Sequence, residues 1–149
     1  MDTGGNTMME KNKELVSAFV REFWNEGNLY CLERYLSADY IDHAYVPGNR
    51  EGLAQMAGIL RAAFPDQASA VESMVAQDDR VVVRLRLTGT HEGNFRGTEA
   101  TFNPVDVKLY REYRIADGKI AEHWALLDTA SLLRQIGAEL NEQPACRIK

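Results

Sequence analysis

The sequence has little of several features that would point to particular classes of protein. It holds two cysteines, Cys31 and Cys146, which lie far apart and form no CxxC pair, so it carries no disulfide framework or cysteine-based metal motif. No apolar run approaches the roughly 20 residues needed to span a bilayer. The start MDTGGNTMMEKNKEL lacks the apolar segment of a secretory signal. We therefore expect a cytoplasmic protein with reduced thiols and no membrane partner.

The sequence also has no cluster of positively charged residues and none of the common catalytic motifs. The net charge is −5, without a basic run or a Lys/Arg stripe, which argues against a nucleic-acid partner. There is no GxSxG elbow, P-loop, GxGxxG or HExxH motif. The three histidines, His43, His91 and His123, are too scattered to predict a metal site from their spacing. We expect neither a metal nor a cofactor.

Length and composition predict one compact domain. The chain has 149 residues, of which 45% are hydrophobic and 26% charged, both ordinary for a globular protein. A chain of this length buries roughly 68–70% of its unfolded surface, enough for a core without disulfide or metal support. We predict a flexible N-terminus over residues 1–11, a single domain over 12–138 and a C-terminal tail over 139–149.

Helical periodicity dominates the first part of the domain. From Asn12 onward, apolar residues form one stripe of an amphipathic helix: Leu15, Val16, Phe19, Val20, Phe23 and Trp24. A short second helix follows, with leucines on one side. DYIDHAY, residues 39–45, is typical of a brief strand or an extended link. Asn49 can cap a third helix, and Pro65 ends it.

After Pro65 the period of the apolar residues changes to two, which predicts strands. The strands cover residues 68–76, 81–90, 105–115 and 119–127, and a short helix, SLLRQIG, follows. Asp117-Gly118 predicts a tight hairpin turn. Helices followed by hairpin-linked strands define an α+β protein. We expect a curved antiparallel sheet wrapped around the helices, forming a cone whose internal pocket holds a small apolar molecule.

Five segments in this order resemble one family. They are NKELVSAFVREFWNEGNL, DYIDH, PGNREGLAQMAGILRAAFPD, VVVRLRLTGTHEGNFRG and RIADGKIAEHWALLDTASLLRQIG. Together they are similar to the SnoaL-like polyketide cyclases of the nuclear transport factor 2-like superfamily, over residues 12–137. The resemblance implies the cone, an enclosed pocket and a homodimer formed through the outer face of the sheet. It does not fix the function, because this fold hosts many activities and also pure binding proteins.

The resemblance also implies a chemistry and two departures from it. The cyclases close a ring by an intramolecular aldol step without metal or cofactor, using an aspartate in the last strand and a histidine on the neighbouring strand. Aligned on RIADGKI and LLRQIG, the aspartate position falls on Ala125 and the histidine position on Arg111. Alanine cannot carry a proton. Asp128 matches an acidic position nearer the end of the strand.

The alternation of residues along the strands indicates which side chains face the pocket. Arg111 shares the apolar face of its strand, and His123 shares a face with Ala125, which the resemblance places in the pocket. We predict that Arg111 holds a carboxylate or enolate oxygen and that His123 moves a proton. Each of these residues also has a structural alternative. Arg111 could instead form an ion pair with Asp128 or Asp42 that only holds the cone closed. His123 could be a hydrogen-bonded residue of the pocket wall without a catalytic role, and Asp128 could cap the last helix.

The sequence thus predicts an enzyme acting by cofactor-free acid/base chemistry on an apolar, carbonyl-bearing, polyketide-like metabolite. The predicted catalytic residues are His123, Arg111 and Asp128. The predicted substrate-binding residues are Tyr40, His43, Phe19, Leu60, Phe64, His91, Leu109, Tyr113 and Ala125. A non-catalytic binding or accessory protein is the alternative that Ala125 supports. A hydroxylase-like branch of the family is a further alternative.

Overall fold

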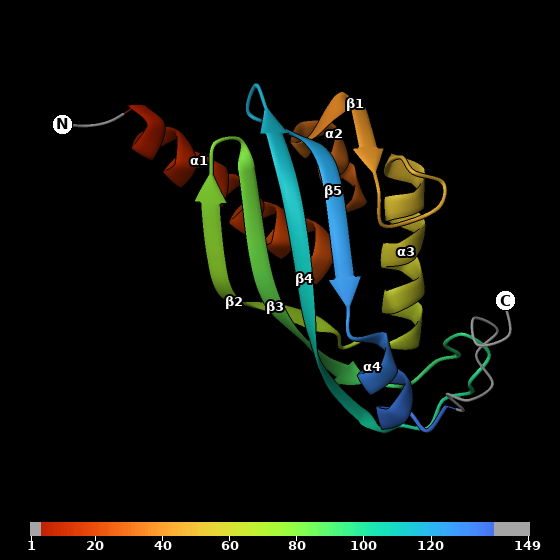
Figure 1. Ribbon diagram of the computed structural model, residues 1–149. Coiled ribbons are helices and arrows are strands. Elements are labelled where there is room, and N and C mark those ends of the chain that lie inside the picture. Colours follow the sequence, from red (N-terminus) through yellow and green to blue (C-terminus); the bar gives the residue numbers. More distant parts are fainter. Residues whose placement is uncertain (1–3, 139–149) are drawn as a thin grey trace, which may run out of the picture.

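A computed structural model of the chain describes residues 4–138, and the predicted tail 139–149 lies outside the described residues (Figure 1). The first helix α1 spans Gly4–Phe19 and continues as a π-helical turn over Val20–Asn25. It begins before Asn12, because good helix formers such as Met8, Met9 and Lys11 extend it beyond the apolar stripe. The stripe itself is buried as predicted: Val16, Phe19, Val20, Phe23 and Trp24.

The remaining elements follow the predicted order. A 3₁₀ turn over Leu29–Cys31 leads into α2 (Leu32–Tyr35), strand β1 (Leu36–Asp42) and helix α3 (Arg50–Ala63). The strands β2 (Ala68–Gln77), β3 (Arg80–Thr90), β4 (Pro104–Ala116) and β5 (Lys119–Leu127) come next, and α4 (Thr129–Gln135) closes the described chain. The two predicted caps are confirmed: the Asn49 side chain caps α3 and the Asp128 side chain caps α4.

The five strands form one curved sheet in the order β1-β5-β4-β3-β2. Strands β2 to β5 pair antiparallel, and positive φ angles at Asp117 (53°) and Gly118 (75°) confirm the predicted tight turn between β4 and β5. The prediction of a purely antiparallel sheet is wrong for β1, which pairs parallel to β5. Strand β1 enters the sheet from the helical segment rather than through a hairpin, so the antiparallel direction is not imposed on it.

The sheet wraps around the helices and buries one of its faces. In Figure 1, α1 lies behind the sheet and α3 lies beside β1 and β5. The inward side chains of β4 alternate strictly with exposed or half-buried ones, and the same holds for most of β3. Arg111 belongs to the inward set, as the sequence predicted. The α+β cone is therefore confirmed, and a charged residue sits in its lining.

Helix α3 presses against the loop that precedes it, and this contact can be tested at two glycines of the same helix. A Cβ on Gly52 would lie 1.9 Å from the Pro47 carbonyl oxygen, whereas a Cβ on Gly58 would have nothing within 4 Å. We expect Gly52→Ala to lower the free energy of unfolding by about 1–3 kcal/mol, because backbone must move.

Gly58→Ala is the matched control for that substitution. It should raise the free energy of unfolding by roughly 0.5–1 kcal/mol, since alanine is the better helix former. Urea unfolding of both variants measures the difference. Equal stability of the two would show that the contact between Gly52 and Pro47 does not hold α3 in place.

Candidate functional site

An apolar cavity of about 180 Å³ lies between α3, the concave face of the sheet and the loop 91–103. Helix α3 contributes three apolar residues, and the strands contribute the opposite wall. The complete lining is Tyr45, Met56, Ile59, Leu60, Leu87, Phe95, Arg96, Leu109, Arg111, Ala125 and Leu127. Two arginines and one tyrosine are the only polar members, and no carboxylate or imidazole is among these eleven residues. The cavity is of the type that binds small apolar molecules through a few polar groups.

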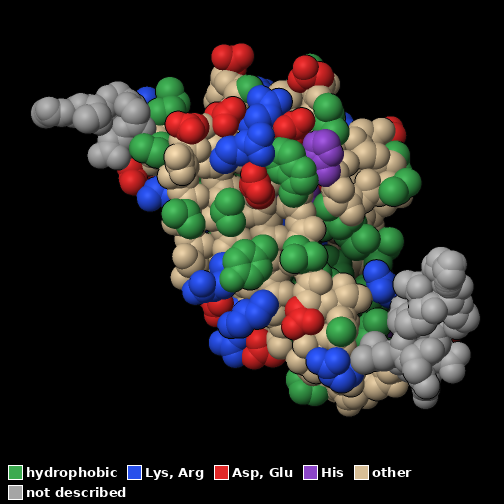
Figure 2. All heavy atoms as spheres, in the orientation of Figure 1, with side chains coloured by type: hydrophobic (Ala, Val, Ile, Leu, Met, Phe, Trp, Pro, Cys, Tyr) green, Lys and Arg blue, Asp and Glu red, His purple; other side chains and the backbone are tan. Residues whose placement is uncertain are grey.

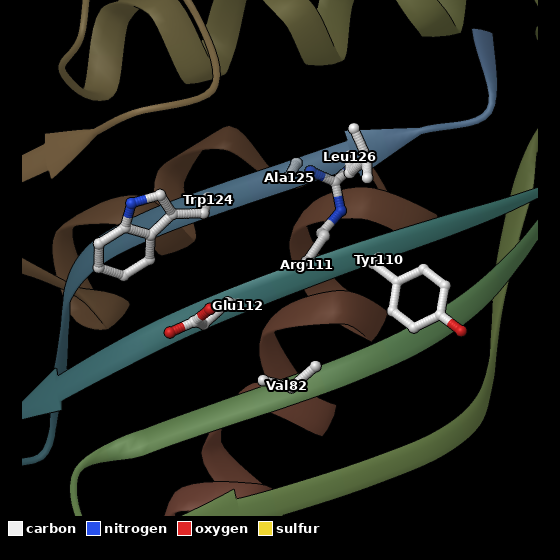
Figure 3. A pocket seen from close by; sticks show the side chains of 7 residues that line it. All are labelled: Val82, Tyr110, Arg111, Glu112, Trp124, Ala125 and Leu126. Carbon is white, nitrogen blue, oxygen red and sulfur yellow. The ribbon is translucent and has the colours of Figure 1, made fainter.

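Arg111 provides the polar end of this cavity. Its side chain is 2% exposed and stacks on the indole ring of Trp24, with 3.9 Å between the guanidinium carbon and the ring centroid. Nη1 donates to the Tyr45 hydroxyl at 2.9 Å and lies 3.1 Å from Nε2 of His123. Arg111 is paired across the ladder with Ala125, and Figure 3 shows the guanidinium close to that small side chain. The small side chain of Ala125 therefore leaves room for the guanidinium of Arg111.

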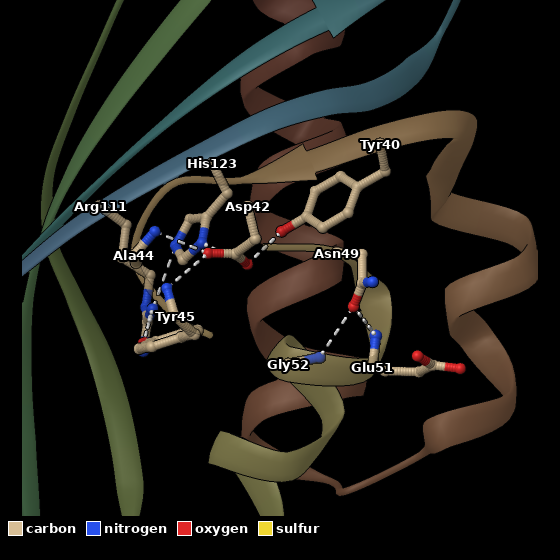
Figure 4. Close-up of polar contacts among 9 residues, drawn as sticks. All are labelled: Tyr40, Asp42, Ala44, Tyr45, Asn49, Glu51, Gly52, Arg111 and His123. Carbon is tan, nitrogen blue, oxygen red and sulfur yellow. Dashed lines mark hydrogen bonds and ion pairs between the residues drawn. The ribbon is translucent and has the colours of Figure 1, made fainter. Parts of the chain in front are cut away.

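His123 and Asp42 follow Arg111 in a row of polar contacts (Figure 4), and neither lines the cavity. His123 is fully buried, and its Nδ1 lies 3.1 Å from Oδ2 of Asp42. Asp42 also accepts hydrogen bonds from the Tyr40 hydroxyl at 2.6 Å and from the Ala44 amide at 2.8 Å. A neutral imidazole with its proton on Nδ1 satisfies all these contacts, because Nε2 is then free to accept from Arg111.

The electrostatics agree with this assignment. Burial, supported by the nearby charge of Arg111, lowers the pKa of His123 to about 4, although Asp42 opposes the shift. For Asp42, burial alone would raise the pKa, but the hydrogen bonds from His123 and Tyr40 bring it below its ordinary value. Burial likewise opposes the charge on Arg111, yet the pKa of its guanidinium stays raised through Tyr45, Tyr113 and Asp42. At neutral pH the row is a carboxylate, a neutral imidazole and a guanidinium.

Neither predicted ion pair of Arg111 is formed among the described residues. Asp42 contacts His123, which separates it from the guanidinium. Asp128 is exposed at the start of α4, where it accepts from the Ser131 amide at 3.2 Å and the Ser131 hydroxyl at 2.7 Å. The contacts of Asp128 are thus those of a helix cap, as the structural alternative predicts.

The predicted substrate-binding residues divide into three groups. Leu60, Leu109 and Ala125 line the cavity. His43 lies exposed, where its ring stacks on Trp124 at 4.7 Å and Nε2 is 3.5 Å from Glu122. The others are buried but do not line the cavity: Tyr40, Phe19, Phe64, His91 and Tyr113.

The predicted site residues do not include two polar residues that line the cavity, Tyr45 and Arg96. Tyr45 lies in the loop between β1 and α3, and Arg96 lies in the loop between β3 and β4. Strand alternation assigns no direction to a side chain in a loop. The available signals were compositional: Tyr45 is the third aromatic or imidazole residue of DYIDHAY, and Arg96 follows Phe95 in the segment HEGNFRG.

The described part of the chain has neither a cluster of metal-binding side chains nor a membrane-spanning helix. Within residues 4–138, no three His, Cys, Asp or Glu side chains come together as a metal-binding group. None of the described helices combines the length and the hydrophobicity needed to cross a membrane.

Comparison with known proteins identifies the family. The model of the SnoaL-like polyketide cyclases matches residues 14–136, and the chain belongs to this family. The putative hydroxylase AclR from Streptomyces galilaeus is 31% identical, with a TM-score of 0.78 over 87% of this chain and 97% of that one. IdmH, a putative polyketide cyclase from Streptomyces antibioticus, is 28% identical, with a TM-score of 0.75 over 85% and 99%. No match is found among curated protein sequences.

Proposed function

We propose that the protein is an enzyme that acts without a cofactor on an apolar, carbonyl-bearing, polyketide-like metabolite. The observation that carries this proposal is the buried guanidinium of Arg111 at the inner end of a largely apolar cavity. Removing a proton next to a carbonyl places negative charge on the carbonyl oxygen. A fixed cation in a dry site stabilises that charge more strongly than water does.

Tyr45 is the second donor of the proposed oxyanion site. Its hydroxyl oxygen accepts from Nη1 of Arg111 at 2.9 Å, so the tyrosine's own hydrogen is available to a ligand in the cavity. We assign His123 a positioning role instead of the proton-carrying role, because its Nε2 is engaged by Arg111 and its ring does not line the cavity. The base is then a water molecule or a basic group of the substrate.

Hydrogen–deuterium exchange at the carbon next to the substrate carbonyl tests this function directly. With an enolisable polyketide ester in D₂O, we expect the wild-type protein to accelerate the exchange, as followed by NMR. Tyr45→Phe should slow it about tenfold, the effect of one neutral hydrogen bond in the transition state. An unchanged exchange rate in Tyr45→Phe would show that the Tyr45 hydroxyl does not stabilise the oxyanion.

A non-catalytic binding protein is the second candidate. It is favoured by the absence of any carboxylate or imidazole from the eleven lining residues of the cavity. If the wild-type protein binds the esters and the free acids tried but accelerates exchange of none, the enzyme proposal fails and this candidate stands. A hydroxylase-like activity is supported only by the 31% identity to AclR.

The outer face of the sheet supports a homodimer, which we include in the proposal together with a cytoplasmic location. A shallow hollow on this face is lined by Val82, Tyr110, Arg111, Glu112, Trp124, Ala125 and Leu126 (Figure 3). Of these residues, Leu126 is 74% exposed. Figure 2 shows apolar side chains on the same face, interspersed with charges of both signs. Light scattering should give the mass of two chains for the wild type and of one chain for Leu126→Arg.

A further inference from the structure

The charge of Arg111 has no direct counter-charge in the described structure. No carboxylate of residues 4–138 forms an ion pair with it, and the nearest acid in its network, Asp42, is separated from it by the neutral His123. A buried charge is normally paired, because desolvation without a partner is costly. The face of the Trp24 ring offsets part of this cost. The part of the desolvation cost that the ring does not offset points to an anionic ligand that pairs with Arg111.

The hydrogen bonds of Arg111 show which side of the guanidinium is available. Nη1 is engaged with both Tyr45 and His123, which accounts for its two hydrogens. Nε is buried without a hydrogen-bond partner, and Nη2 has none among the described residues either. Of these two nitrogens only Nε is sealed from solvent, so Nη2 is the donor that a carboxylate in the cavity can reach.

The residue opposite Arg111 leaves Nη2 unpaired. Ala125 is its direct partner in the ladder between β4 and β5 and lines the same cavity. Side chains in directly opposed positions have their Cβ atoms about 4.5–5.5 Å apart, so an acid at position 125 would reach the guanidinium. Alanine provides no such acid and leaves the space open to a ligand.

A second arginine stands where the cavity is bounded by the loop 91–103. Arg96 lies in a tight turn closed by hydrogen bonds between Phe95 and Thr98, and Arg96 and Gly97 have φ angles of 51° and 87°. Such a turn favours asparagine or glycine at its first central position, so arginine is there at a conformational cost. Its guanidinium lies 5.8 Å from the centroid of the Phe95 ring, and no ion pair of Arg96 occurs among the described residues.

We infer that the ligand of this cavity is an apolar carboxylic acid, bound in its anionic form. This inference rests on the proposed function and deepens it by naming the substrate class. The carboxylate accepts from Nη2 of Arg111, Tyr45 donates to a neighbouring carbonyl oxygen, and Arg96 adds a second positive charge beside the ligand. In a chain with a net charge of −5, a cavity lined by two arginines and no acid selects anions.

Two fluorescent probes with the same skeleton test the inference without knowledge of the substrate. 8-Anilinonaphthalene-1-sulfonate is anionic, and N-phenyl-1-naphthylamine is the same molecule without the sulfonate. We expect the wild-type protein to bind the anion at least about tenfold more tightly, the effect expected of a buried charge-assisted hydrogen bond. Equal affinity for the two probes, or tighter binding of the neutral one, would overturn the inference.

Three variants locate the bound anion. Ala125→Asp should weaken binding of the sulfonate probe at least about tenfold, because the new carboxylate pairs with Arg111. Arg96→Asn suits the turn and should weaken it about threefold through loss of a solvent-exposed charge. Both variants should weaken binding of the sulfonate probe more than binding of the neutral probe, because only the sulfonate loses an attraction to charge. Arg84→Gln removes a charge from the outer face of the sheet, where Arg84 pairs with Glu72, and should change neither affinity.

The outcomes separate the inference from the function on which it rests. If Arg84→Gln weakens sulfonate binding as much as Ala125→Asp does, the probe binds the outer face and the inference is wrong. If the probe results are as expected but no substrate undergoes exchange, the anion site stands and the enzyme proposal fails. If exchange occurs with a methyl ester and not with its free acid, the enzyme stands and the acid specificity is refuted.

Discussion

Arg111→Met is expected to slow substrate hydrogen–deuterium exchange by roughly 10²–10³-fold, the effect of removing one donor from an oxyanion site. Arg111 is the one cationic residue at the inner end of the cavity, and its guanidinium is fixed by Tyr45, His123 and the Trp24 ring. Water can replace neither its charge nor its position. The loss should fall on both KM and kcat, because Arg111 holds the substrate carboxylate in the ground state and its charge also stabilises the neighbouring enolate oxygen as it develops.

Methionine suits the site because it tests the charge while keeping much of the volume. Its thioether can pack on the Trp24 ring. The substitution leaves the Nε2 acceptor of His123 without its donor, at a cost of about 1–3 kcal/mol, but it also removes a buried charge, so the variant should remain folded. Arg84→Met on the outer face is the matched control and should keep full activity. Exchange within a few-fold of wild type in Arg111→Met would contradict the proposed mechanism.

The features that the sequence predicted well depend on residues close together in the chain. The inward direction of Arg111 follows from alternation within β4 alone. The caps at Asn49 and Asp128 involve amides two or three residues away. The turn at Asp117 and Gly118 is equally local. In each case the physical cause lies within one element or one turn, so no knowledge of tertiary contacts is needed.

The network behind Arg111 has a different origin. Asp42 and His123 are 81 residues apart, and they meet because β1 pairs in parallel with β5, with Asp42 opposite His123. Nothing local in DYIDHAY indicates that pairing. Strand alternation put His123 on the same face as Ala125, and the resemblance placed that face in the pocket. Neither gives the depth of a side chain, so the sequence predicts that His123 lines the pocket. In the structure Arg111 and Tyr45 stand between it and the ligand space.

His123 should make the stability of the protein depend on pH in a window where few other groups titrate. The pKa of His123 is about 4 in the folded protein, and its ordinary value is 6.5. Between these values the unfolded chain binds more protons than the folded one, so the free energy of unfolding rises with pH. The contribution is complete above pH 6.5 and is lost as the pH falls toward 4.

We expect the free energy of unfolding to fall by about 2 kcal/mol between pH 7 and pH 5 because of this one imidazole. His123→Gln should be less stable at pH 7, since glutamine reproduces the contacts with Asp42 and Arg111 only in part, but its stability should depend much less on pH in this window. Urea unfolding at a series of pH values measures both. An equally steep fall in His123→Gln would place the titrating group elsewhere.

Nitrogen-15 NMR gives an independent measurement, because the row of Asp42, His123 and Arg111 requires a neutral His123 ring with its proton on Nδ1 at pH 6. An imidazolium at that pH would put two adjacent cations beneath the cavity, and Arg111 could not then donate to His123.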